Sequence, residues 1–407
     1  MTEFLSGSAV QFDPFSDDYF NDPYETYRRL RNDAPVYCND TYGFWALSRY
    51  EDVSRAHKDW QTFSSTHGSS LDMMSAPPEF WEERRLIISM DPPEHDRLRS
   101  LVSRVFTPRA VQSLEPMVRE VVAAFIEPIA GAASFDAVAD FAGPFPVEII
   151  SRMLGVPEGD RQQIRHWLDL GLHREPGEVG PSPEGIAAQE EATGYWRALV
   201  AEKRACPADD MISRLIDAEV DRGDGQGITR LTDFEITGFL GLLGGAGAET
   251  VTKLVGNAFV LFARNQAQYQ RVKDDPGLIP GAVEEILRIL PPSQYQGRFT
   301  MKESEFHGVV IPAGVPMLLV TGAAMRDERI FPDPDRFDVG RPIPQNLGFG
   351  IGIHSCLGAA LARIESRVAI EERIRRWPDY VIDEPGLERV NMANVAGYQN
   401  VPVHVAG

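Results

Sequence analysis

The sequence is poor in cysteine, and the three cysteines that it contains are scattered. Cys38, Cys206 and Cys356 form no CxxC pair in a chain of 407 residues. Zinc and iron–sulfur sites need several thiolates close together, and a disulfide framework needs an even set of cysteines. These site types are therefore excluded, and any cysteine chemistry is expected to depend on one thiol acting alone.

Basic residues and long apolar runs are also scarce. Against 60 acidic residues there are 40 lysines and arginines, so the formal net charge is −20. Such a charge repels a phosphate backbone, and no nucleic-acid partner is expected. No apolar run reaches the roughly 18 residues of a membrane span, and no basic leader precedes an apolar stretch. We therefore expect a cytoplasmic protein with no membrane partner.

The chain has no internal repeat, no Ser/Gly linker and no Gly-rich dinucleotide fingerprint. Length alone would favour two or three domains, but Pro and Gly are spread between short helical stretches instead of gathering at one boundary. We predict a single domain over residues 1–407, mainly α-helical with small β-sheets. Two irregular segments, 64–90 and 173–187, are predicted to be substrate-access loops, because long ordered loops are usually lids or binding loops.

The longest predicted helix begins after Thr232, which stands three residues before Glu235 in the spacing of a capping box. Residues 239–260 are apolar nearly all round, which is typical of a central helix that is buried on most faces. Glu249 and Thr250 interrupt this apolar run, so burial alone does not explain the sequence. We interpret this pair as functional, the alternative being that Glu249 is a partly solvated acid.

The strongest motif runs from Phe349 to Gly358, Phe-Gly-Ile-Gly-Ile-His-Ser-Cys-Leu-Gly, and leads directly into a helical pattern. The sulfur of Cys356 would lie at a helix N-terminus, where the helix dipole and free N–H groups favour a thiolate, the form that ligates iron. Gly350 lets the backbone turn tightly around the sulfur, and Gly358 leaves room for a flat macrocycle. The alternative, a buried structural cysteine, suits an isolated cysteine better than a loop of this composition.

Continued by Leu361-Ala-Arg-Ile-Glu365, this motif resembles the haem-binding signature of the cytochrome P450 family at every fixed position. The resemblance extends over nearly the whole chain. It implies the P450 fold, a triangular prism with haem b between the long central helix and the helix after the cysteine loop. It also implies that Cys356 ligates the haem iron and that Phe349, Gly350 and Gly358 line the haem.

Glu285 and Arg288 stand three residues apart on another predicted helix. By themselves they would be a surface ion pair worth a fraction of a kilocalorie. The resemblance implies that the pair is buried, is joined by Arg336, and supports the cysteine loop without taking part in the reaction. Met325 stands where many relatives carry Asn, which affects only the details of loop bonding.

His95 and Arg99 stand four residues apart, on one face of the helix that follows Asp91-Pro-Pro. By themselves they would be an ordinary solvated face. The resemblance assigns them, together with Arg298 and His354, to the haem propionates. Cationic and hydrogen-bond-donating groups are what two carboxylates require.

The segment Ala246-Gly-Ala-Glu249-Thr250 resembles the oxygen-binding segment of the family. A Thr hydroxyl in a helix can bond the carbonyl three or four residues back, here that of Gly247 or Ala246, and this opens a notch for dioxygen and water. The family's mechanism implies that Thr250 supports proton delivery to dioxygen and that Glu249 relays protons from solvent. Val251 stands where a second Thr is common.

The resemblance implies a monooxygenase that inserts one oxygen atom of O2 into a C–H bond or a double bond, since a cysteinate ligand favours O–O cleavage. Because the chain has no dinucleotide fingerprint, electrons from NAD(P)H are expected to arrive through a separate reductase and a ferredoxin. The protein is expected to be a monomer. The ferredoxin is expected to dock on arginines near the cysteine side, namely Arg97, Arg99, Arg104, Arg109, Arg363, Arg367, Arg373, Arg375 and Arg376.

Two other functions stay open at this point. A peroxide-using relative would have the same fold but would not need proton delivery, and Glu249 with Thr250 argues against it. A non-enzymatic haem binder or sensor would need an output domain, and no segment resembles one.

The sequence does not name the substrate. The resemblance puts the pocket wall at mostly apolar residues, which is compatible with a steroid, terpenoid, fatty acid or polyketide. These residues are Met73, Met74, Trp81, Ile87, Leu240, Leu243, Gln294, Tyr295, Gln296, Val395, Ala396 and Tyr398.

Overall fold

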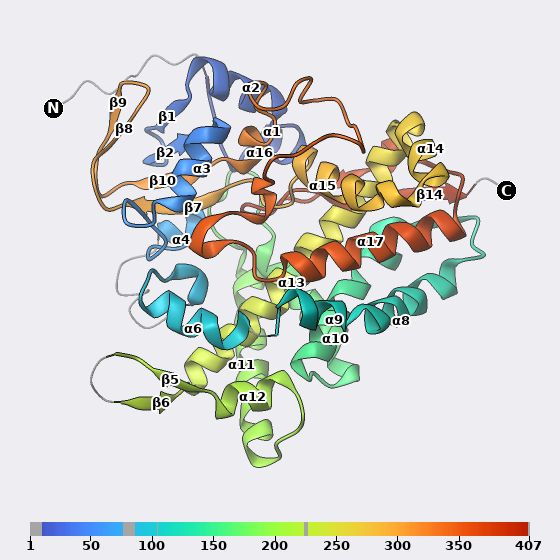
Figure 1. The fold of residues 1–407 in the computed structure, drawn as a ribbon, viewed down its shortest axis with the longest axis horizontal. Helices are drawn as coiled ribbons and strands as arrows, with labels where there is room; N and C mark the ends of the chain where they lie inside the picture. Colours follow the sequence, from blue (N-terminus) through green and yellow to red (C-terminus); the bar gives the residue numbers. More distant parts are fainter. Residues whose placement is uncertain (1–9, 76–85, 104, 224–226, 406–407) are drawn as a thin grey trace.

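The computed structural model describes residues 10–75, 86–103, 105–223 and 227–405. A region rich in β-strands lies beside a larger helical region, and the long helix α13 crosses the helical region near its centre (Figure 1). The prediction of a mainly helical chain with small sheets is confirmed. In the described ranges, no helix is both long enough and apolar enough to cross a membrane.

The main sheet of the β-rich region has five strands in the order β1-β2-β10-β7-β3, so it combines strands from the N-terminal and C-terminal parts of the chain. Strand β10 pairs with β2 in parallel and with β7 in antiparallel fashion. The strands are β1 (Val36–Asn39), β2 (Phe44–Leu47), β3 (Phe63–Ser64), β7 (Gln296–Thr300) and β10 (Pro316–Leu319). The helices of this region are α1 (Asp17–Asn21), α2 (Tyr24–Asp33), α3 (Tyr50–Lys58), α4 (Leu71–Met74) and α16 (Thr321–Ala324).

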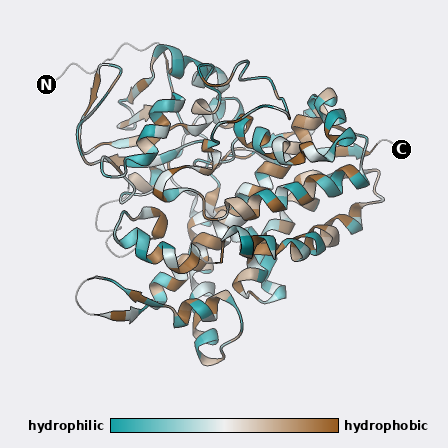
Figure 2. Ribbon diagram, in the orientation of Figure 1, coloured by the Kyte–Doolittle hydropathy of each residue, from teal (hydrophilic) through white to brown (hydrophobic). Residues whose placement is uncertain are grey.

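The helical region contains the largest core cluster (Figure 2). Its helices are α6 (Glu94–Ser103), α7 (Pro108–Gln112), α8 (Glu115–Ile126), α9 (Pro144–Leu154), α10 (Arg161–Leu172), α11 (Pro183–Ala205), α12 (Met211–Asp217), α13 (Asp233–Arg264), α14 (Gln266–Asp274), α15 (Ile279–Ile289) and α17 (Ala359–Arg376). The chain also forms smaller sheets. One of them consists of β11 (Tyr380–Ile382), β14 (Pro402–Val405) and β4 (Ser134–Asp136). The pairs are β5 (Glu219–Asp221) with β6 (Ile228–Arg230), β8 (Ser304–Phe306) with β9 (Val309–Ile311), and β12 (Glu388–Arg389) with β13 (Tyr398–Asn400).

Helix α13 begins with the predicted capping box. Thr232 Oγ1 accepts from the Glu235 N–H at 3.2 Å, and a Glu235 carboxylate oxygen accepts from the Thr232 N–H at 2.8 Å. The glycines inside the helix let its neighbours come close: a Cβ at Gly247 would lie 3.1 Å from a side-chain carbon of Ile150 on α9. Close packing therefore compensates for helix propensity losses of up to about 1 kcal/mol per glycine.

The second predicted access loop is shorter than expected. Residues 183–187 belong to α11, because Ser182 caps that helix by accepting from the Gly185 N–H at 3.1 Å. Pro183 at the first helical position needs no N–H partner, so its presence does not prevent a helix. In the first loop, residues 64–75 and 86–90 contain α4 and the short 3-10 helix η1 (Ile87–Ser89), while 76–85 lie outside the described residues.

Candidate active site

The cysteine loop consists of two short 3-10 turns, η6 (Leu347–Phe349) and η7 (Gly352–His354), followed by Cys356 and α17. The Cys356 N–H donates to the Phe349 carbonyl at 2.7 Å, which closes the loop on itself. Gly350 and Gly352 have φ values of +62° and +76°, which side-chain-bearing residues rarely adopt. The cysteine thus reaches the N-terminus of α17 through a turn that needs both glycines.

The electrostatic surroundings of Cys356 act in two directions. The residue is accessible, but protein atoms surround the sulfur on most sides, and this burial raises the pKa of the thiol. The N–H groups of Gly358 and Ala359, together with the charges of Arg99 and Arg363, lower the pKa. The helix N-terminus therefore favours the thiolate as predicted, but burial outweighs it. A cation at the sulfur is the partner that would stabilise the thiolate.

Helix α13 carries an accessible strip although most of it is buried. Ala246 is exposed, and Leu242, Leu243 and Thr250 are half-buried at helical spacing. Near the cysteine, a Cβ at Gly358 would meet no atom within 4 Å, so the protein itself does not require glycine there. A flat group lying over the loop would need the space that a glycine leaves open.

Two of the four residues predicted to bind the haem propionates have a buried ring nitrogen without a partner, and a third is a buried cation. The ring atoms His95 Nε2 and His354 Nε2 are buried without a partner, and the two rings lie 4.4 Å apart between centroids. Arg298 is 5% exposed and donates to the Gly297 carbonyl at 2.7 Å. Burial lowers its pKa to about 10, which leaves it charged at neutral pH.

Arg99, the fourth residue predicted to bind a propionate, donates to the Ser355 carbonyl and so holds the cysteine loop. Burial lowers the pKa of His354 to about 2, and it also lowers that of His95. Two neutral imidazoles and one buried cation fit carboxylate groups, which need donors and positive charge. The sequence interpretation missed His57, whose two ring nitrogens are buried without partners and whose pKa is lowered to about 3, mainly by burial and then by Arg298.

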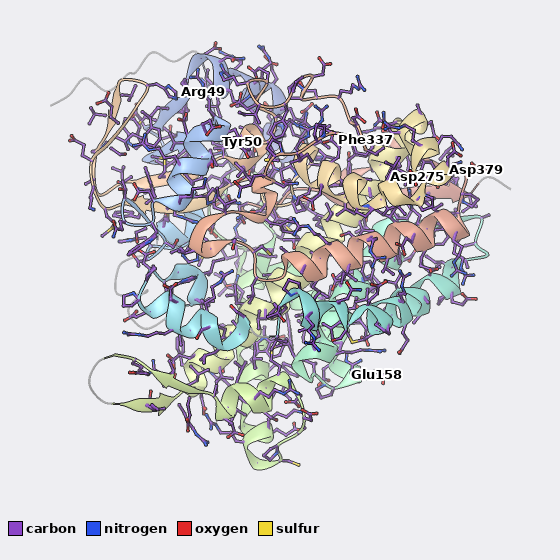
Figure 3. The ribbon with its side chains drawn as sticks, viewed as in Figure 1. Arg49, Tyr50, Glu158, Asp275, Phe337 and Asp379 are labelled. Atoms are coloured by element: carbon purple, nitrogen blue, oxygen red, sulfur yellow. The ribbon has the colours of Figure 1, made fainter. Side chains whose placement is uncertain are left out.

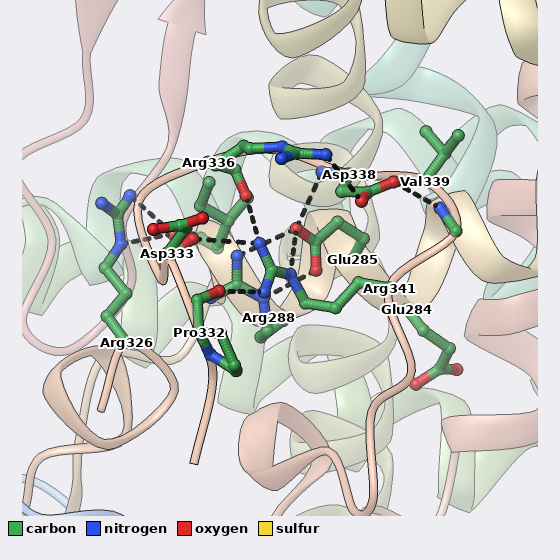
Figure 4. A network of polar contacts seen from close by, with 12 residues as sticks. Glu284, Glu285, Arg288, Arg326, Pro332, Asp333, Arg336, Asp338, Val339 and Arg341 are labelled. Atoms are coloured by element: carbon green, nitrogen blue, oxygen red, sulfur yellow. Dashed lines mark hydrogen bonds and ion pairs between the residues drawn. The ribbon is translucent and has the colours of Figure 1, made fainter. Parts of the chain in front are cut away.

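A buried ion-pair network supports the loop from the side of α15 (Figure 4). Glu285 and Arg288 are both 0% exposed and meet at 2.6 Å. The third member is Arg341, whose Nε lies 3.1 Å from Glu285, and not Arg336. The side chain of Arg336 is 62% exposed and pairs with Asp338, while its carbonyl accepts from Arg341 at 2.8 Å. The chain bends after residue 336 so that the later arginine points inward, which corrects the prediction.

Met325 connects this network to the cysteine loop. Its carbonyl accepts from Arg288 at 2.9 Å, and its sulfur accepts from the Leu347 N–H at 3.3 Å. Tyr50, at the start of α3, donates its hydroxyl to the Gln345 carbonyl at 2.9 Å and so holds the approach to the loop (Figure 3). The departure from the family pattern at Met325 therefore leaves the loop bonded.

On α13, Thr250 Oγ1 donates to the Ala246 carbonyl at 3.1 Å, one of the two bonds predicted from the sequence. Glu249 is turned into the protein and forms an ion pair with Lys253 at 2.7 Å. Burial raises the pKa of Glu249, although Lys253 opposes the shift. Glu249 and Thr250 are neighbours on the helix. Glu249 is buried, however, whereas the predicted relay needs an acid in contact with solvent.

Comparison with known proteins identifies this arrangement. The sequence profile described as Cytochrome P450 matches residues 278–378, the part that holds Glu285 and Cys356. The protein named cytochrome P450 123 of Mycobacterium tuberculosis is 41% identical over 406 residues, which cover 100% of this chain and 99% of that protein. The chain belongs to the cytochrome P450 family.

Two further P450s are similar over most of the chain. The erythromycin C-12 hydroxylase of Saccharopolyspora erythraea is 38% identical, over 92% of each chain. The crystal structure of CYP109E1 from Bacillus megaterium in complex with testosterone has 30% identity and a TM-score of 0.83, and the match covers 95% of this chain and 98% of that one. This P450 is thus a monooxygenase with haem iron and a cysteine thiolate, as predicted.

Several residues predicted to line the substrate pocket form hydrogen bonds inside this P450 or are buried in it. Gln294 accepts from Tyr27 at 2.9 Å, Tyr295 donates to the Ala393 carbonyl at 3.2 Å, and Tyr398 accepts from Arg264 at 3.4 Å. Leu240 and Ala396 are also buried. These five residues are buried or hydrogen-bonded inside the protein, and their place in the pocket wall stays a prediction.

The remaining predicted pocket residues differ in how far they are buried. Met74 is buried against Gly297, and Trp81 lies outside the described residues. The half-buried ones are Met73, Ile87, Leu243, Gln296 and Val395. Between η1, α6 and α13 lies a small hollow with room for about one water molecule, which is lined by Leu86, Ile87, Met90, Leu98, Glu235, Gly238, Phe239 and Leu242.

A buried ion pair joins the two segments that the sequence predicted to be access loops. Arg174 is 4% exposed and meets Asp72 of α4 at 2.6 Å. The Arg174 guanidinium also donates to the carbonyls of Gly171 and His173, and the backbone N–H of Arg174 donates to the Asn391 carbonyl at 2.8 Å. The described parts of the two loops are therefore fixed to each other, a link that the sequence did not indicate.

Proposed function

We propose that this P450 inserts one oxygen atom of O2 into a C–H bond or double bond of a large, mainly apolar substrate. The observation that carries the proposal is the pairing on α13 of the Thr250 hydroxyl, bonded to the Ala246 carbonyl, with the buried acid Glu249. An enzyme that reduces dioxygen needs a held water and a proton source at that position. When bound, the haem supplies the iron at which dioxygen is reduced and the O–O bond is split.

The residues of the chain have separate roles in this proposal. Cys356 would hold the iron, and His95, His354 and Arg298 would hold the two carboxylates of the haem. Phe349, Gly350, Gly358 and Ala246 would line the macrocycle. Thr250 would hold a water by its hydroxyl, and Glu249 would pass protons to it. Arg99 would keep the cysteine loop in place through Ser355.

The proposed substrate class is a macrocyclic or polycyclic compound with few polar groups. Support comes from the accessible strip of α13, where Leu242, Leu243 and Ala246 lie within about two turns before Thr250. A relative is named for hydroxylation of erythromycin, and a similar structure was solved with testosterone. Macrolides and steroids should be titrated against the ferric protein, with displacement of the iron-bound water read as a shift of the Soret band.

The same protein preparation tests the reaction class. Cys356→Ser should abolish the long-wavelength Soret band of the reduced carbon monoxide complex, because that band depends on thiolate ligation. Thr250→Ala should leave NADH consumption but uncouple it from product. Unchanged coupling would favour the peroxide-using alternative, and no substrate-dependent NADH consumption in the unaltered enzyme would favour a haem binder.

We further propose a ferredoxin as the electron donor, with a more limited docking surface than the sequence suggested. Arg363, Arg367, Arg375 and Arg376 pair with glutamates, and Arg373 is buried. Arg104 lies outside the described residues. Arg97 donates to the Arg222 carbonyl and Arg99 to the Ser355 carbonyl. Arg109 on α7 is exposed and has no ion-pair partner in the described part of the chain.

Arg109→Glu should therefore slow reduction by an acidic ferredoxin, and rising salt should weaken reduction of the unaltered protein. Arg28→Glu on α2 makes the same charge change in the β-rich region and serves as the control. Reduction that depends neither on salt nor on Arg109 would contradict this docking site. A monomer in the cytoplasm remains part of the proposal, consistent with three free cysteines.

A further inference from the structure

Three histidines in the described part of the chain have a buried ring nitrogen without a hydrogen-bond partner, namely His57, His95 and His354. The resemblance assigned the last two to the haem propionates. It did not assign His57, at the end of α3, although both ring nitrogens of this residue lack a partner and the residue is 3% exposed. Buried polar atoms nearly always have partners, so this ring needs a group that the chain itself does not supply.

The packing of α3 places His57 beside the cysteine loop. Val53, one turn before His57, belongs to the same core cluster as Leu347 and Ile351 of the loop. The backbone comes closest at the last turn of α3, because a Cβ at Gly352 would lie 2.6 Å from the His57 carbonyl oxygen. The end of α3 is therefore in direct contact with the turn that leads to the cysteine.

Strand β7 approaches His57 from a second side. After α3 the chain enters β3, where Ser64 pairs with Phe299 of β7. Side chains alternate along a strand, so Arg298 and Gln296 point to one face of β7 and Phe299 to the other. Burial lowers the pKa of His57 to about 3, the charge of Arg298 adds to this shift, and Gln296 opposes it. The ring therefore lies on the face of β7 that carries Arg298.

The side chains beside His57 have their hydrogen bonds elsewhere. The amide nitrogen of Gln296 donates to the Ser293 hydroxyl at 2.8 Å, and its oxygen accepts from the Thr321 hydroxyl at 2.6 Å. The Arg298 guanidinium donates to a backbone carbonyl of its own strand at 2.7 Å. The imidazole of His57 is thus buried near a cation, and its capacity to form hydrogen bonds is unused.

The chemistry of this position suits a carboxylate. A neutral imidazole has one N–H donor and one acceptor nitrogen, and a donor next to a buried cation matches an anion. The anionic groups proposed at Arg298 and His354 are the two carboxylates of the haem. A separate metal ion is a poorer match, because the described residues contain no group of three or more metal-binding side chains.

We propose that His57 is a further residue of the haem-binding site and donates a hydrogen bond from α3 to a haem carboxylate. His95 comes from α6, His354 from the cysteine loop and Arg298 from β7, so His57 adds a fourth element to the site. Its role is to hold the haem in position and to disperse the negative charge of the carboxylate. The inference rests on the proposed function, which places the carboxylates at His95, His354 and Arg298.

Replacing His57 tests this role without any turnover. His57→Leu removes both ring nitrogens and should fold, because an apolar side chain replaces a polar one that has no partner in the protein. Haem should then transfer from the holoenzyme to apomyoglobin about tenfold faster or more, since a hydrogen bond to a charged group is lost. The reduction potential should become more negative, because a carboxylate with fewer donors stabilises ferric iron. His57→Gln keeps an N–H donor and should reverse part of both changes.

His67→Leu is the matched control. The His67 ring stacks on Phe299 with 3.8 Å between ring centroids, on the face of β7 opposite to Arg298. The substitution makes the same chemical change beside the same strand, and it should alter neither the rate of haem loss nor the potential.

Exchanging the haem for its dimethyl ester tests whether the carboxylate is the partner of His57. The ester has no carboxylate, so the difference between His57→Leu and the unaltered protein should disappear. A difference that persists with the ester, or an equal effect of His67→Leu, would overturn the proposal.

His95→Leu separates this inference from the proposed function. If this variant loses haem faster, but only when the carboxylates are free, while His57→Leu behaves like the unaltered protein, the proposed haem site stands and the role of His57 fails. If neither variant responds to the ester, the carboxylates lie elsewhere and both assignments fail. If His57→Leu behaves as expected but no tested macrolide or steroid is oxidised, the role of His57 stands and the substrate class fails.

Discussion

Two buried carboxylates, Glu285 and Glu249, have opposite surroundings in this molecule. Glu285 accepts four hydrogen bonds: its Oε1 accepts from Arg288, Arg341 and the Asp338 N–H, and its Oε2 accepts from Arg288. The carboxylate of Glu249 has one close cation, the Lys253 ammonium 2.7 Å from Oε1. A carboxylate that is held by donors from several directions is rigid, whereas one with a single charged partner can change its protonation state more easily.

The difference follows from where each acid lies. Glu285 faces the coil between α16 and η6, whose backbone and arginine supply donors from several directions. Glu249 lies within an apolar helix, where the nearest donors are side chains one turn away or on α10. The first arrangement supports the cysteine loop and the second permits proton movement.

The largest expected effect comes from breaking the ion-pair network around Glu285. Arg288→Ala leaves Glu285 buried with half of its donors gone and the Met325 carbonyl without its partner. Removing one member of a buried pair costs about 3 to 5 kcal/mol, so little folded holoenzyme should be recovered. Urea unfolding and haem content after purification measure this. A stable variant with full haem content would show that the network is dispensable.

The correction of Arg336 to Arg341 gives the next largest effect. Arg341→Ala removes the ion pair with Glu285 and bonds to the carbonyls of Pro332, Asp333 and Arg336. We expect the free energy of unfolding to fall by about 2 to 3 kcal/mol. Arg336→Ala removes an exposed pair and should cost under about 0.5 kcal/mol. Equal losses in the two variants would contradict the assignment.

A third buried pair, Asp72 with Arg174, joins the two predicted access loops, and the effect of breaking it should fall between these cases. Arg174→Met leaves Asp72 unpaired at 12% exposure, with an expected loss of about 1 to 3 kcal/mol. It should also speed the association of an azole probe, followed by stopped-flow absorbance. Exchanging the two residues, Asp72→Arg with Arg174→Asp, should recover part of both effects. Association at the original rate in the single variant would mean that this pair does not restrict access.

The smallest effect is on the pH dependence of stability. Burial raises the folded-state pKa of Glu249, so its contribution to the free energy of unfolding is highest below its unfolded pKa and falls as pH rises. Glu249→Gln should remove that fall. Glu115 is the opposite case, because bonds from Arg367 and Arg119 lower its pKa to about 2. Its contribution is present above its ordinary value of 4.5 and is lost as pH falls toward 2.

Denaturant unfolding of both variants across acid pH checks these signs. Glu115→Gln should flatten the loss of stability on the acid side, whereas Glu249→Gln should flatten the decline toward neutral pH. Slopes of the same sign for both glutamates would contradict the burial assigned to Glu249.

Local patterns were sufficient to predict the elements whose causes lie close together in the chain. The capping box at Thr232, the glycine turns before Cys356 and the bond from Thr250 to Ala246 all join residues within a few positions of each other. The lysine four residues after Glu249 was also visible as a charge in an apolar helix, although the sequence interpretation did not use it. Short-range geometry is encoded in spacing, which a single sequence contains.

Contacts between distant segments needed the tertiary structure. Whether Arg336 or Arg341 reaches Glu285 depends on how an irregular coil bends, and no periodicity specifies that. The same holds for the hydrogen bonds of Tyr295 to Ala393 and of Arg264 to Tyr398, and for the ion pair of Asp72 with Arg174, 102 residues apart. The sequence alone was enough to predict Cys356 as the iron ligand and to find the acid next to the hydroxyl, because each lies in a compact motif. Only the folded chain decided which cations surround those acids, because burial and direction are properties of the packed molecule.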